Sequence, residues 1–393
     1  MDIGKGRCNP MKVVLFIGEL KAGGAERQII NLANGIAART HRVFLITIFP
    51  GGNLCSLVSN SEYLTHIPVW NEKKYCKISR FFQILFSPII LIYLLSRIQP
   101  NIVYSFLGLT NLIAWIATRF GFSKKLVWGL RSGKRKLVWK QSIPDLLSRL
   151  ISRSVPLVIA NSELGKEYYF HKGYRPIKMC SIPNGVDVDY FKPYEKAGTI
   201  LRNKLNIKEG KFVIGIAGRI NPVKNLELFF HSAEIVLETN RQLVFVVVGA
   251  GEMSYIEKLK KLNRKLQIEQ HVIWIGFQDD MIGVYNLFDL LVSSSSVEGS
   301  PNTVLEAMAC GTPCIVTDVG DSARIVNDPN CVVPPGYPEA LSAAINQFIE
   351  TDHSPEYKSL LRKRIVDNYS IEIMVQRTMD AFRIFIPLKY QQN

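Results

Sequence analysis

The sequence predicts an α/β protein of two domains, each built on a parallel β-sheet. Its 393 residues exceed the usual size of one hydrophobic core, and 47% of them are hydrophobic against 21% charged, so two cores can be filled. Short apolar runs alternate with helical stretches in both halves, which is typical of successive βαβ units. The composition turns polar and irregular after Asp187, which places the expected domains at residues 1–190 and 191–369. A C-terminal helix, 370–388, is expected to pack back on the first domain.

The first half begins with a predicted strand, residues 12–17, a loop that contains Gly23 and Gly24, and a helix from about Ala25 to Ala38. A strand, glycine loop and helix in this order can bring backbone amides to a phosphate, although these glycines do not form the GxGxxG pattern. The apolar runs then predict further strands at 42–48, 64–68, 102–105, 125–128, 157–160 and 177–182.

The second half repeats the alternation and predicts a second parallel sheet. Its strands are expected at 212–217, 243–248, 272–275, 290–292, 314–317 and 331–333. Gly249 and Gly251 suggest a dinucleotide loop, but the third glycine is absent and no acidic residue closes an obvious following strand. A nicotinamide cofactor is therefore not expected, and no other cofactor is predicted.

The stretch from residue 297 to 313, VEGSPNTVLEAMACGTP, is the best candidate for a functional site. Glu298 follows the predicted strand 290–292, and ligands bind at the carboxyl edge of an open α/β sheet. The next helix would present its positive amino end there. This end is formed by Ser300, Pro301, Asn302 and Thr303. Glu306 lies about one turn into the helix, so the two carboxylates can grip different parts of one ligand. The alternative is a simple loop charge and an ordinary helix-surface residue.

Four motifs in order resemble the family-four retaining glycosyltransferases, whose signature is two glutamates separated by seven residues. Glu298 and Glu306 have this spacing. The other matching segments are Gly218-Arg219 with Lys224-Asn225, Gly23-Gly24-Ala25-Glu26, and Pro183-Asn184-Gly185-Val186-Asp187. The resemblance covers about residues 11–385. It implies the GT-B fold, in which two Rossmann-like domains face each other across a donor and acceptor cleft.

The resemblance also implies roles for these residues toward a nucleotide-diphosphate sugar, which is expected to be uridine-based. Arg219 and Lys224 would stabilise the leaving diphosphate without a metal ion, because a guanidinium fork and an ammonium supply compact positive charge. Glu306 would bind the ribose hydroxyls, and Glu298 would give electrostatic support to the donor sugar without acting as a nucleophile. Two further sets of contacts are implied. The backbone of Gly23 and Gly24 would approach the phosphates and the reacting carbon, and the amides of Ser300, Asn302 and Thr303 would line the sugar and phosphate.

The sequence departs from the family pattern after the strand at 125–128. Family members often place a histidine near the reacting sugar there, whereas this chain runs from Trp128 through Gly129 and Leu130 to Arg131. A histidine-assisted mechanism is therefore not expected. Arg131 becomes a candidate contact for an acceptor or donor phosphate.

The net charge of +15 is confined to the first half. Residues 1–190 hold 26 Lys and Arg against 10 Asp and Glu, whereas residues 191–393 hold 22 against 23. Such asymmetry suggests an anionic partner: nucleic acid, a membrane surface or a phosphorylated substrate. A solvated basic face with no partner is the alternative. Nucleic acid is not expected, because no nucleic-acid module accompanies the basic cluster at Arg131, Lys134, Arg135, Lys136 and Lys140.

A membrane surface fits the charge better. Lys73, Lys74, Lys77 and Arg80 precede an apolar run at 81–95, which at fifteen residues is shorter than the roughly 20 needed to span a bilayer. The run predicts a helix with some apolar surface exposed, and full burial under neighbouring helices is the alternative.

The seven cysteines form no CxxC pair and predict neither a disulfide framework nor a zinc site. The chain does not open with a signal-peptide pattern. The prediction is thus a cytoplasmic, metal-independent glycosyltransferase, peripheral on the inner face of the membrane. Its acceptor is expected to be a polyprenyl-diphosphate-linked saccharide of surface-glycan assembly. A nucleotide-sugar epimerase and a non-catalytic membrane- or RNA-binding protein are the alternatives.

Overall fold

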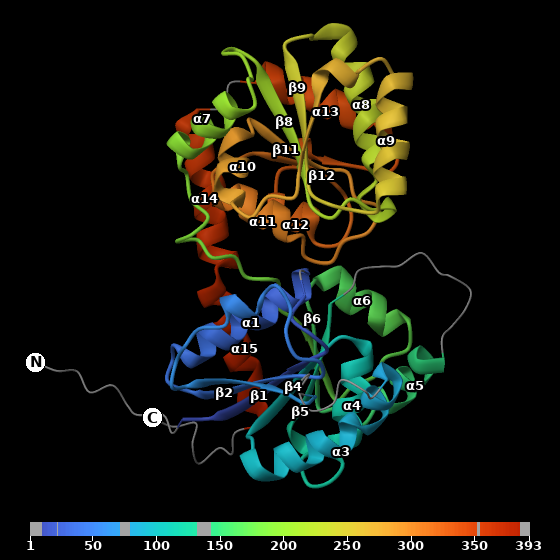
Figure 1. Cartoon of the computed structure of the whole chain (residues 1–393), viewed down its shortest axis with the longest axis vertical. Helices are drawn as coiled ribbons and strands as arrows, with labels where there is room; N and C mark the ends of the chain where they lie inside the picture. Colours follow the sequence, from blue (N-terminus) through green and yellow to red (C-terminus); the bar gives the residue numbers. More distant parts are fainter. Residues whose placement is uncertain (1–9, 22, 71–78, 132–142, 352–353, 386–393) are drawn as a thin grey trace, which may run out of the picture. The chain divides into compact units, whose positions relative to one another are not determined.

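The computed structural model describes residues 10–21, 23–70, 79–131, 143–351 and 354–385. The chain forms two compact units, the first from Met1–Gly185 with Ile371–Asn393 and the second from Val186–Ser370. Each is built on a parallel sheet with helices on both faces (Figure 1). The predicted fold class, two Rossmann-like α/β domains, is confirmed.

The first unit contains a seven-stranded sheet of order β3-β2-β1-β4-β5-β6-β7. Its strands are β1 (Lys12–Ile17), β2 (Arg42–Thr47), β3 (Leu64–Pro68), β4 (Ile102–Phe106), β5 (Leu126–Leu130), β6 (Leu157–Ala160) and β7 (Lys178–Ser181). Helices α1 (Gly24–Ala37) and α15 (Ile371–Phe382) cover one face. The other face packs against α3 (Arg80–Ile98), α4 (Gly108–Thr118), α5 (Ile143–Ser152) and α6 (Glu163–His171).

The second unit contains a six-stranded sheet of order β10-β9-β8-β11-β12-β13. Its strands are β8 (Phe212–Ala217), β9 (Leu243–Val248), β10 (Val272–Gly276), β11 (Leu290–Ser293), β12 (Cys314–Thr317) and β13 (Val332–Val333). Its helices are α7 (Glu195–Lys204), α8 (Leu226–Thr239), α9 (Met253–Lys265), α10 (Met281–Leu287), α11 (Asn302–Ala309), α12 (Ser322–Val326), α13 (Pro338–Glu350) and α14 (Pro355–Tyr369). The strand order reverses between β8 and β11, and such a switch point opens a crevice at the carboxyl edge.

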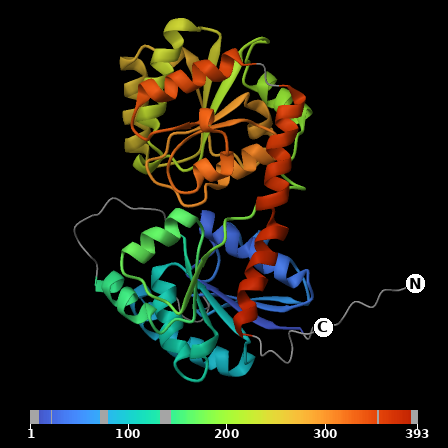
Figure 2. The same cartoon turned by 180° about the vertical axis from the view of Figure 1, so that it is seen from behind.

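The chain passes between the units after Gly185, not after residue 190 as predicted. Gly185 belongs to the first unit because its amide and carbonyl both bond the Gln28 side chain at 2.9 Å. It also lies against α15, since a Cβ at this position would be 2.9 Å from the Cα of Ile371. Figure 2 shows α15 (red) beside α1 (blue). The terminal helix spans Ile371–Phe382, which is shorter than the predicted 370–388, and residues 386–393 lie outside the described part.

Helix α3 is longer than the fifteen-residue run seen in the sequence. It has 19 residues, because Arg80 and the segment from Ser96 to Ile98 extend the apolar part at either end. By length and composition alone it could cross a membrane, and it is the one helix of the described residues that could. Its inner face is buried in the unit, while six large apolar side chains on the other face are exposed. The alternative of full burial is therefore wrong.

Candidate functional site

The predicted phosphate-binding segment and Glu298 lie together in the second unit, at the switch point of its sheet. Strands β8 and β11 are paired neighbours, so the residues that follow them reach the same part of the carboxyl edge. Gly218 and Arg219 leave β8, and Glu298 follows the serines that end β11. Residues 80 positions apart in sequence thus come together through the topology of the sheet.

Glycines allow the loops after β8 and β9 to touch. The amide of Ile220 donates to the carbonyl of Ala250 at 2.8 Å. A Cβ on Gly249 would lie 1.8 Å from the Gly218 oxygen, and one on Gly251 would lie 2.0 Å from the Ile220 oxygen. Close packing of the two loops therefore requires glycine at both positions.

Lys224 is positioned by a short capped turn. The side-chain oxygen of Asn221 accepts hydrogen bonds from the amides of Val223 (3.0 Å) and Lys224 (3.2 Å), which starts the 3₁₀ turn Pro222–Lys224. Asn225 ends it in the left-handed region, with φ of 49°. The turn fixes the direction in which the lysine leaves the backbone.

The ammonium of Lys224 forms an ion pair with Glu298, with 2.5 Å between Nζ and Oε1. The lysine side chain is 23% exposed and the glutamate 13%, so water screens the pair only in part. Ser295 Oγ donates to the same oxygen at 2.7 Å. The structure thus brings together a predicted diphosphate ligand and the predicted sugar contact.

The serines after β11 tie this loop to the Lys224 turn. Ser294 Oγ donates to the carbonyls of Lys224 and Asn225, each at 3.0 Å, and the Ser296 amide donates to the Val223 carbonyl at 2.8 Å. No role in the site was predicted for these serines from the sequence. A run of serines at the carboxyl end of a strand suggests hydrogen bonding at that edge of the sheet. It does not indicate that the partners lie about 70 residues earlier in the sequence.

Gly320, in the loop after β12, packs closely against the backbone of Glu298. Its φ is 56°, and a Cβ there would lie 2.6 Å from the Glu298 oxygen and 2.5 Å from the Gly299 oxygen. The amide of the next residue, Asp321, donates to the Gly299 carbonyl at 2.8 Å. The loop after β12 therefore sets the position of the backbone that carries Glu298.

Gly320→Ala is expected to lower the free energy of unfolding by about 2 to 4 kcal/mol, because it adds a backbone collision to the cost of a left-handed alanine. Gly336→Ala is the matched control, since Gly336 also has a positive φ, 91°, but no atom within 4 Å of a new Cβ. Urea unfolding gives the loss of stability in each variant, and the difference between the two losses reports the collision. Equal destabilisation of the two would contradict a steric role for Gly320.

The amino end of α11 lies beside the β8 loop. Ser300 and Pro301 are buried, while Asn302 and Thr303 are partly exposed. Pro301 occupies the N-cap and the helix begins at Asn302. A Cβ on Gly218 would be 3.5 Å from Lys224 Cε and 3.9 Å from Thr303 Cγ2, so the three segments converge. The first-turn amides of α11 consequently face the region of the basic groups.

Glu306 is a buried residue and not an ordinary helix-surface charge. It is 5% exposed, and its Oε2 accepts a hydrogen bond of 2.7 Å from the Tyr285 hydroxyl. Burial, together with the nearby Glu306 carboxylate, raises the pKa of the Cys310 thiol to about 12, so Cys310 is an inert packing residue. Sequence reasoning missed Tyr285, because a single tyrosine within a short apolar helix carries no signal.

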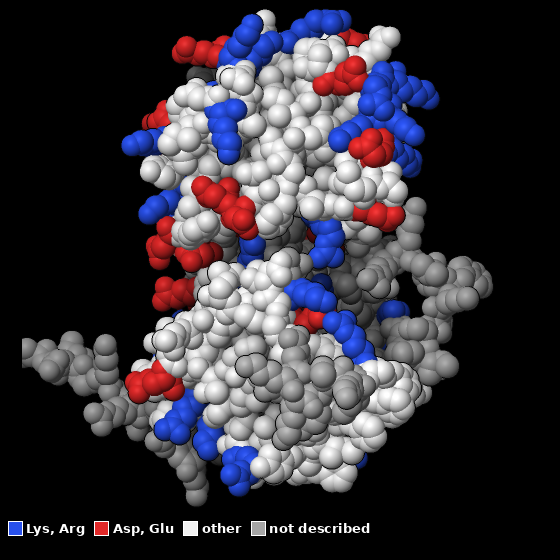
Figure 3. Space-filling view, viewed as in Figure 1, with Lys and Arg blue, Asp and Glu red and all other residues white. Residues whose placement is uncertain are grey.

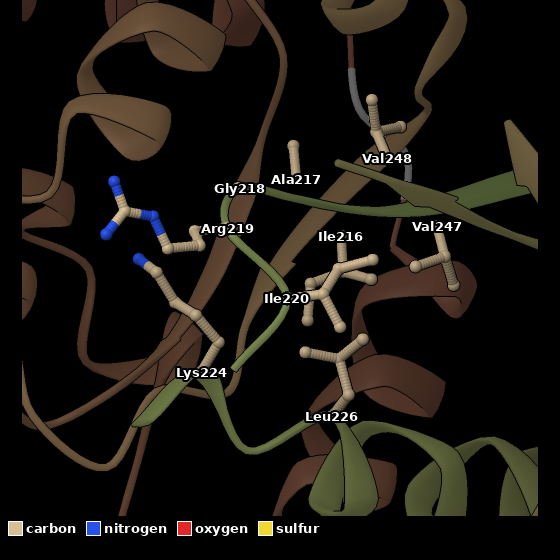
Figure 4. Close-up of a pocket in the computed structure, with 9 residues that line it drawn as sticks. All are labelled: Ile216, Ala217, Gly218, Arg219, Ile220, Lys224, Leu226, Val247 and Val248. Carbon is tan, nitrogen blue, oxygen red and sulfur yellow. The ribbon is translucent and has the colours of Figure 1, made fainter. Parts of the chain in front are cut away.

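Arg219 and Lys224 reach toward the same space. Figure 4 shows both side chains on one side of the loop, with their nitrogen atoms near each other, and Ile216, Ile220 and Leu226 on the other side. The apolar residues anchor the loop in the core, and Arg219 is exposed. The loop therefore presents two cations from a rigid base, which suits an anionic ligand.

Gly23, Gly24 and Arg131 belong to the first unit. Gly23 has extended backbone, with φ of −164°, and caps α1, which begins at Gly24. The Arg131 guanidinium lies 4.3 Å over the Phe106 ring and donates to Asn184 Oδ1 (3.1 Å) and the Tyr104 hydroxyl (3.2 Å). The roles of these three residues toward a donor or acceptor stay predictions.

Within the described ranges, no group of three or more His, Cys, Asp and Glu side chains could hold a metal ion. The expected polybasic residues Lys73, Lys74 and Lys77 lie outside the described residues, as do Lys134, Arg135, Lys136 and Lys140.

Family models match both halves of the chain. Residues 22–190 match the family described as Glycosyltransferase Family 4, and residues 199–367 match Glycosyl transferases group 1. The chain therefore contains two segments that each match a glycosyltransferase family model. The second of these contains Arg219, Lys224, Glu298 and Glu306.

Curated relatives include UDP-Gal:alpha-D-GlcNAc-diphosphoundecaprenol alpha-1,3-galactosyltransferase of Escherichia coli, which is 30% identical over 252 residues, 61% of this chain and 62% of that enzyme. Another is the Campylobacter jejuni enzyme GalNAc-alpha-(1->4)-GalNAc-alpha-(1->3)-diNAcBac-PP-undecaprenol alpha-1,4-N-acetyl-D-galactosaminyltransferase, 26% identical over 303 residues, 76% of this chain and 77% of that one. The putative glycosyltransferase EpsF of Bacillus subtilis is 24% identical over 215 residues, 54% of each chain. The match thus spans less than two thirds of the E. coli and B. subtilis relatives.

Solved structures share the fold over nearly the whole chain. The crystal structure of Anabaena HepE in complex with UDP has a TM-score of 0.79 at 20% identity, covering 95% of this chain and 100% of that one. HepE in complex with UDP-glucose gives the same TM-score and coverage at 21% identity. Together with the two parallel sheets, this likeness shows the expected GT-B fold.

Proposed function

We propose that this protein is a retaining glycosyltransferase that moves a sugar from a UDP-sugar to a lipid-linked saccharide acceptor. The observation that carries the proposal is the convergence of Arg219, Lys224, Glu298 and the amino end of α11 at the switch point of the second sheet. Two cations and a set of helix amides form an anion site, and an adjacent carboxylate suits sugar hydroxyls. A diphosphate joined to a sugar combines both features.

In this mechanism Arg219 and Lys224 stabilise the charge that develops on the leaving diphosphate. Lys224 already contacts Glu298, so a bound phosphate would share the ammonium with the carboxylate. Lys224 would then contact both the leaving diphosphate and Glu298, the proposed sugar-binding residue. Lys224 and Arg219 would neutralise the charge of the diphosphate without a metal ion. Activity is accordingly expected to survive chelation by EDTA.

Glu298 supports the sugar by electrostatics and does not attack it. One of its oxygens binds both Lys224 and Ser295, and both interactions lower the nucleophilicity of the carboxylate. We propose that the acceptor attacks from the face of the leaving group, which retains the configuration at the reacting carbon. Glu306, fixed by Tyr285, is proposed to bind the ribose.

Uridine and a diphosphoundecaprenol-type acceptor are proposed because of the relatives. HepE is named as a complex with UDP and with UDP-glucose. The E. coli and C. jejuni relatives are named for acceptors linked to diphosphoundecaprenol or PP-undecaprenol. Such an acceptor is held in a membrane, so we propose that the protein works at the inner face of the cytoplasmic membrane.

Arg131 is proposed to bind the diphosphate of that acceptor. It lies at the carboxyl edge of β5, and its hydrogen-bond partners Asn184 and Tyr104 are neutral. Burial raises the pKa of the Tyr104 phenol, which keeps this partner uncharged at neutral pH. Neither of these partners offsets the positive charge of the guanidinium, which suits an anionic ligand.

Arg131→Ala is expected to raise the KM for a diphosphate-linked acceptor by about 10- to 100-fold, because a charge-assisted hydrogen bond contributes about 1.5 to 3 kcal/mol. The KM for the donor should stay unchanged. Arg131→Lys keeps the charge and should recover part of the loss. Steady-state kinetics with each substrate varied in turn measures the split, and a rise in donor KM alone would assign Arg131 to the donor.

Melting curves with a panel of nucleotide sugars test the donor class directly. A donor at about 100 times its Kd should stabilise the fold by about 2.7 kcal/mol, so UDP-sugars should raise the Tm more than GDP- or ADP-sugars. An epimerase would convert its nucleotide sugar without an acceptor. Incubation of the stabilising nucleotide sugar alone, followed by analysis of its sugar, separates that activity from transfer.

A further inference from the structure

One helix of the first unit carries an apolar stripe that the proposed chemistry does not use. The outer face of α3 consists of Phe81, Phe82, Leu85, Phe86, Ile89 and Tyr93, each between 46% and 70% exposed. Most are separated by four positions, so they form one stripe along the helix. Six large exposed side chains in one row make a patch of the kind that marks an interaction surface.

We propose that the outer face of α3 docks the protein on the surface of an anionic lipid bilayer, with the helix lying in the interface. Phe82 and Phe86 stack with ring centroids 6.4 Å apart, and Tyr93 ends the stripe with a polar hydroxyl. Aromatic rings with an apolar body and a polar tip are suited to the depth of lipid headgroups.

The charge around this face selects an anionic partner. Between Glu72 and Asp145 the sequence contains no acidic residue and thirteen Lys and Arg. In the described part, Arg80 and Arg97 lie near the two ends of α3, and Arg119 and Lys124 follow the neighbouring helix α4. All four are exposed. Cations beside an apolar face attract anionic headgroups while the face inserts.

The neighbouring helix α4 also exposes apolar side chains. It packs beside α3, and near its carboxyl end Ile116 and Phe120 are 44% and 67% exposed. Figure 3 shows the surface over α3 as mostly white, with little acidic charge. The docking surface therefore has an apolar centre with basic residues at its margins, in place of the mixed charges of an ordinary solvated helix.

The inner face of α3 argues against a membrane-spanning role. Leu91 and Leu95 are fully buried in the core of the unit. The Trp70 indole donates to Gln83 O (2.9 Å) and Ser87 Oγ (3.1 Å). These bonds connect the proline-containing middle of the helix to the segment that follows β3. Crossing a bilayer would expose this face and break these bonds. The helix consequently stays part of the unit and enters lipid only with its outer face.

Flotation of the full chain with vesicles tests this surface. The variant Phe82→Ser/Leu85→Ser/Ile89→Ser removes the middle of the stripe. The matched control is Ile200→Ser/Met253→Ser/Leu360→Ser, which removes three side chains of similar exposure from α7, α9 and α14 of the second unit. Wild type and control should float with phosphatidylcholine/phosphatidylglycerol vesicles, and the α3 variant should show a partition coefficient at least about tenfold lower.

Binding should fall at about 0.5 M salt, and alkaline carbonate should release the protein from the vesicles. Flotation of the α3 variant equal to wild type, equal binding to pure phosphatidylcholine, or resistance to carbonate would each overturn the proposal. Loss of self-association in place of lipid binding, measured by light scattering without vesicles, would overturn it in favour of a second copy of this chain.

The purpose of the docking, access to a lipid-linked acceptor, rests on the proposed function, but the vesicle test does not. A UDP-induced rise in Tm, unchanged in the α3 variant, would show that this variant is folded. If every UDP-sugar fails to transfer while flotation persists, the proposed reaction fails and the docking surface stands. If transfer succeeds and flotation is absent, the surface fails alone.

Discussion

Lys224→Ala is expected to lower kcat/KM for the donor by roughly 100- to 1,000-fold, the largest effect of any single change considered for this chain. The ammonium lies 2.5 Å from Glu298 and beside Arg219, so its loss removes charge from the leaving diphosphate and also releases the carboxylate. Lys224→Arg keeps the positive charge and should recover part of the activity. Kinetics with the donor varied measures both variants.

Lys260→Ala is the matched control for this change. Lys260 also pairs with a glutamate, Glu257 at 3.2 Å, but both side chains lie on the exposed surface of α9. Its removal should alter neither kinetics nor, by more than about 0.5 kcal/mol, stability. Unchanged turnover in Lys224→Ala would remove Lys224 from the site and with it the metal-free stabilisation of the diphosphate.

Glu298→Gln is expected to lower kcat by about 100-fold while changing donor affinity little. The amide keeps the shape of the side chain but loses the negative charge that binds Lys224 and Ser295, so the sugar contact is weakened most where positive charge develops. The double variant with Lys224→Ala should lose less than the sum of the two single losses, because the residues act as one pair. Strict additivity would contradict that coupling.

Glu306→Gln provides the contrast within the same motif. If Glu306 binds the ribose, which is held equally before and during reaction, its change should raise the donor KM more than it lowers kcat. Tyr285→Phe should act in the same direction and more weakly, since it removes the hydrogen bond that orients the carboxylate. The opposite pattern in Glu298→Gln and Glu306→Gln would exchange the proposed roles of the two glutamates.

The sheets could be predicted from the sequence because parallel strands buried on both faces are continuous apolar runs. The strands at 64–68, 157–160, 212–217, 243–248 and 314–317 have the predicted bounds. The predicted boundary after residue 190 was late, because it followed composition, whereas the structural boundary is set by the bonds between Gln28 and Gly185.

The connections within the site were much less accessible to sequence reasoning. The motif spacing indicated that Lys224 and Glu298 belong to one site, but not that they bind each other. The positions of Ser294, Tyr285 and Gly320 depend on loops that meet only after the sheet has formed. Sequence periodicity reports which face of an element is buried, and it carries no information about which loop a polar side chain will reach.

The exposed stripe of α3 could be predicted only in part from the sequence. Its apolar composition predicted exposed surface, because a helix without a polar face cannot be covered on all sides by one sheet. Which residues face outward required the structure, since Ser87, the polar residue in the middle of the helix, turns inward to bond the Gln83 carbonyl and Trp70. A pattern read from hydrophobicity alone would have placed this serine on the solvent side.

Acceptor-dependent transfer of labelled sugar is the most direct test of the account. The purified chain is incubated with EDTA and a diphosphoundecaprenol-linked saccharide. The donor is the UDP-sugar that raises the Tm most, with a radioactive label in its sugar. The label in the organic extract is then counted. The account predicts labelled lipid only when acceptor is present, an α-linkage from an α-configured donor, and loss of product in Lys224→Ala. An absolute requirement for a divalent cation, a β-linkage, or conversion of the nucleotide sugar without acceptor would contradict it.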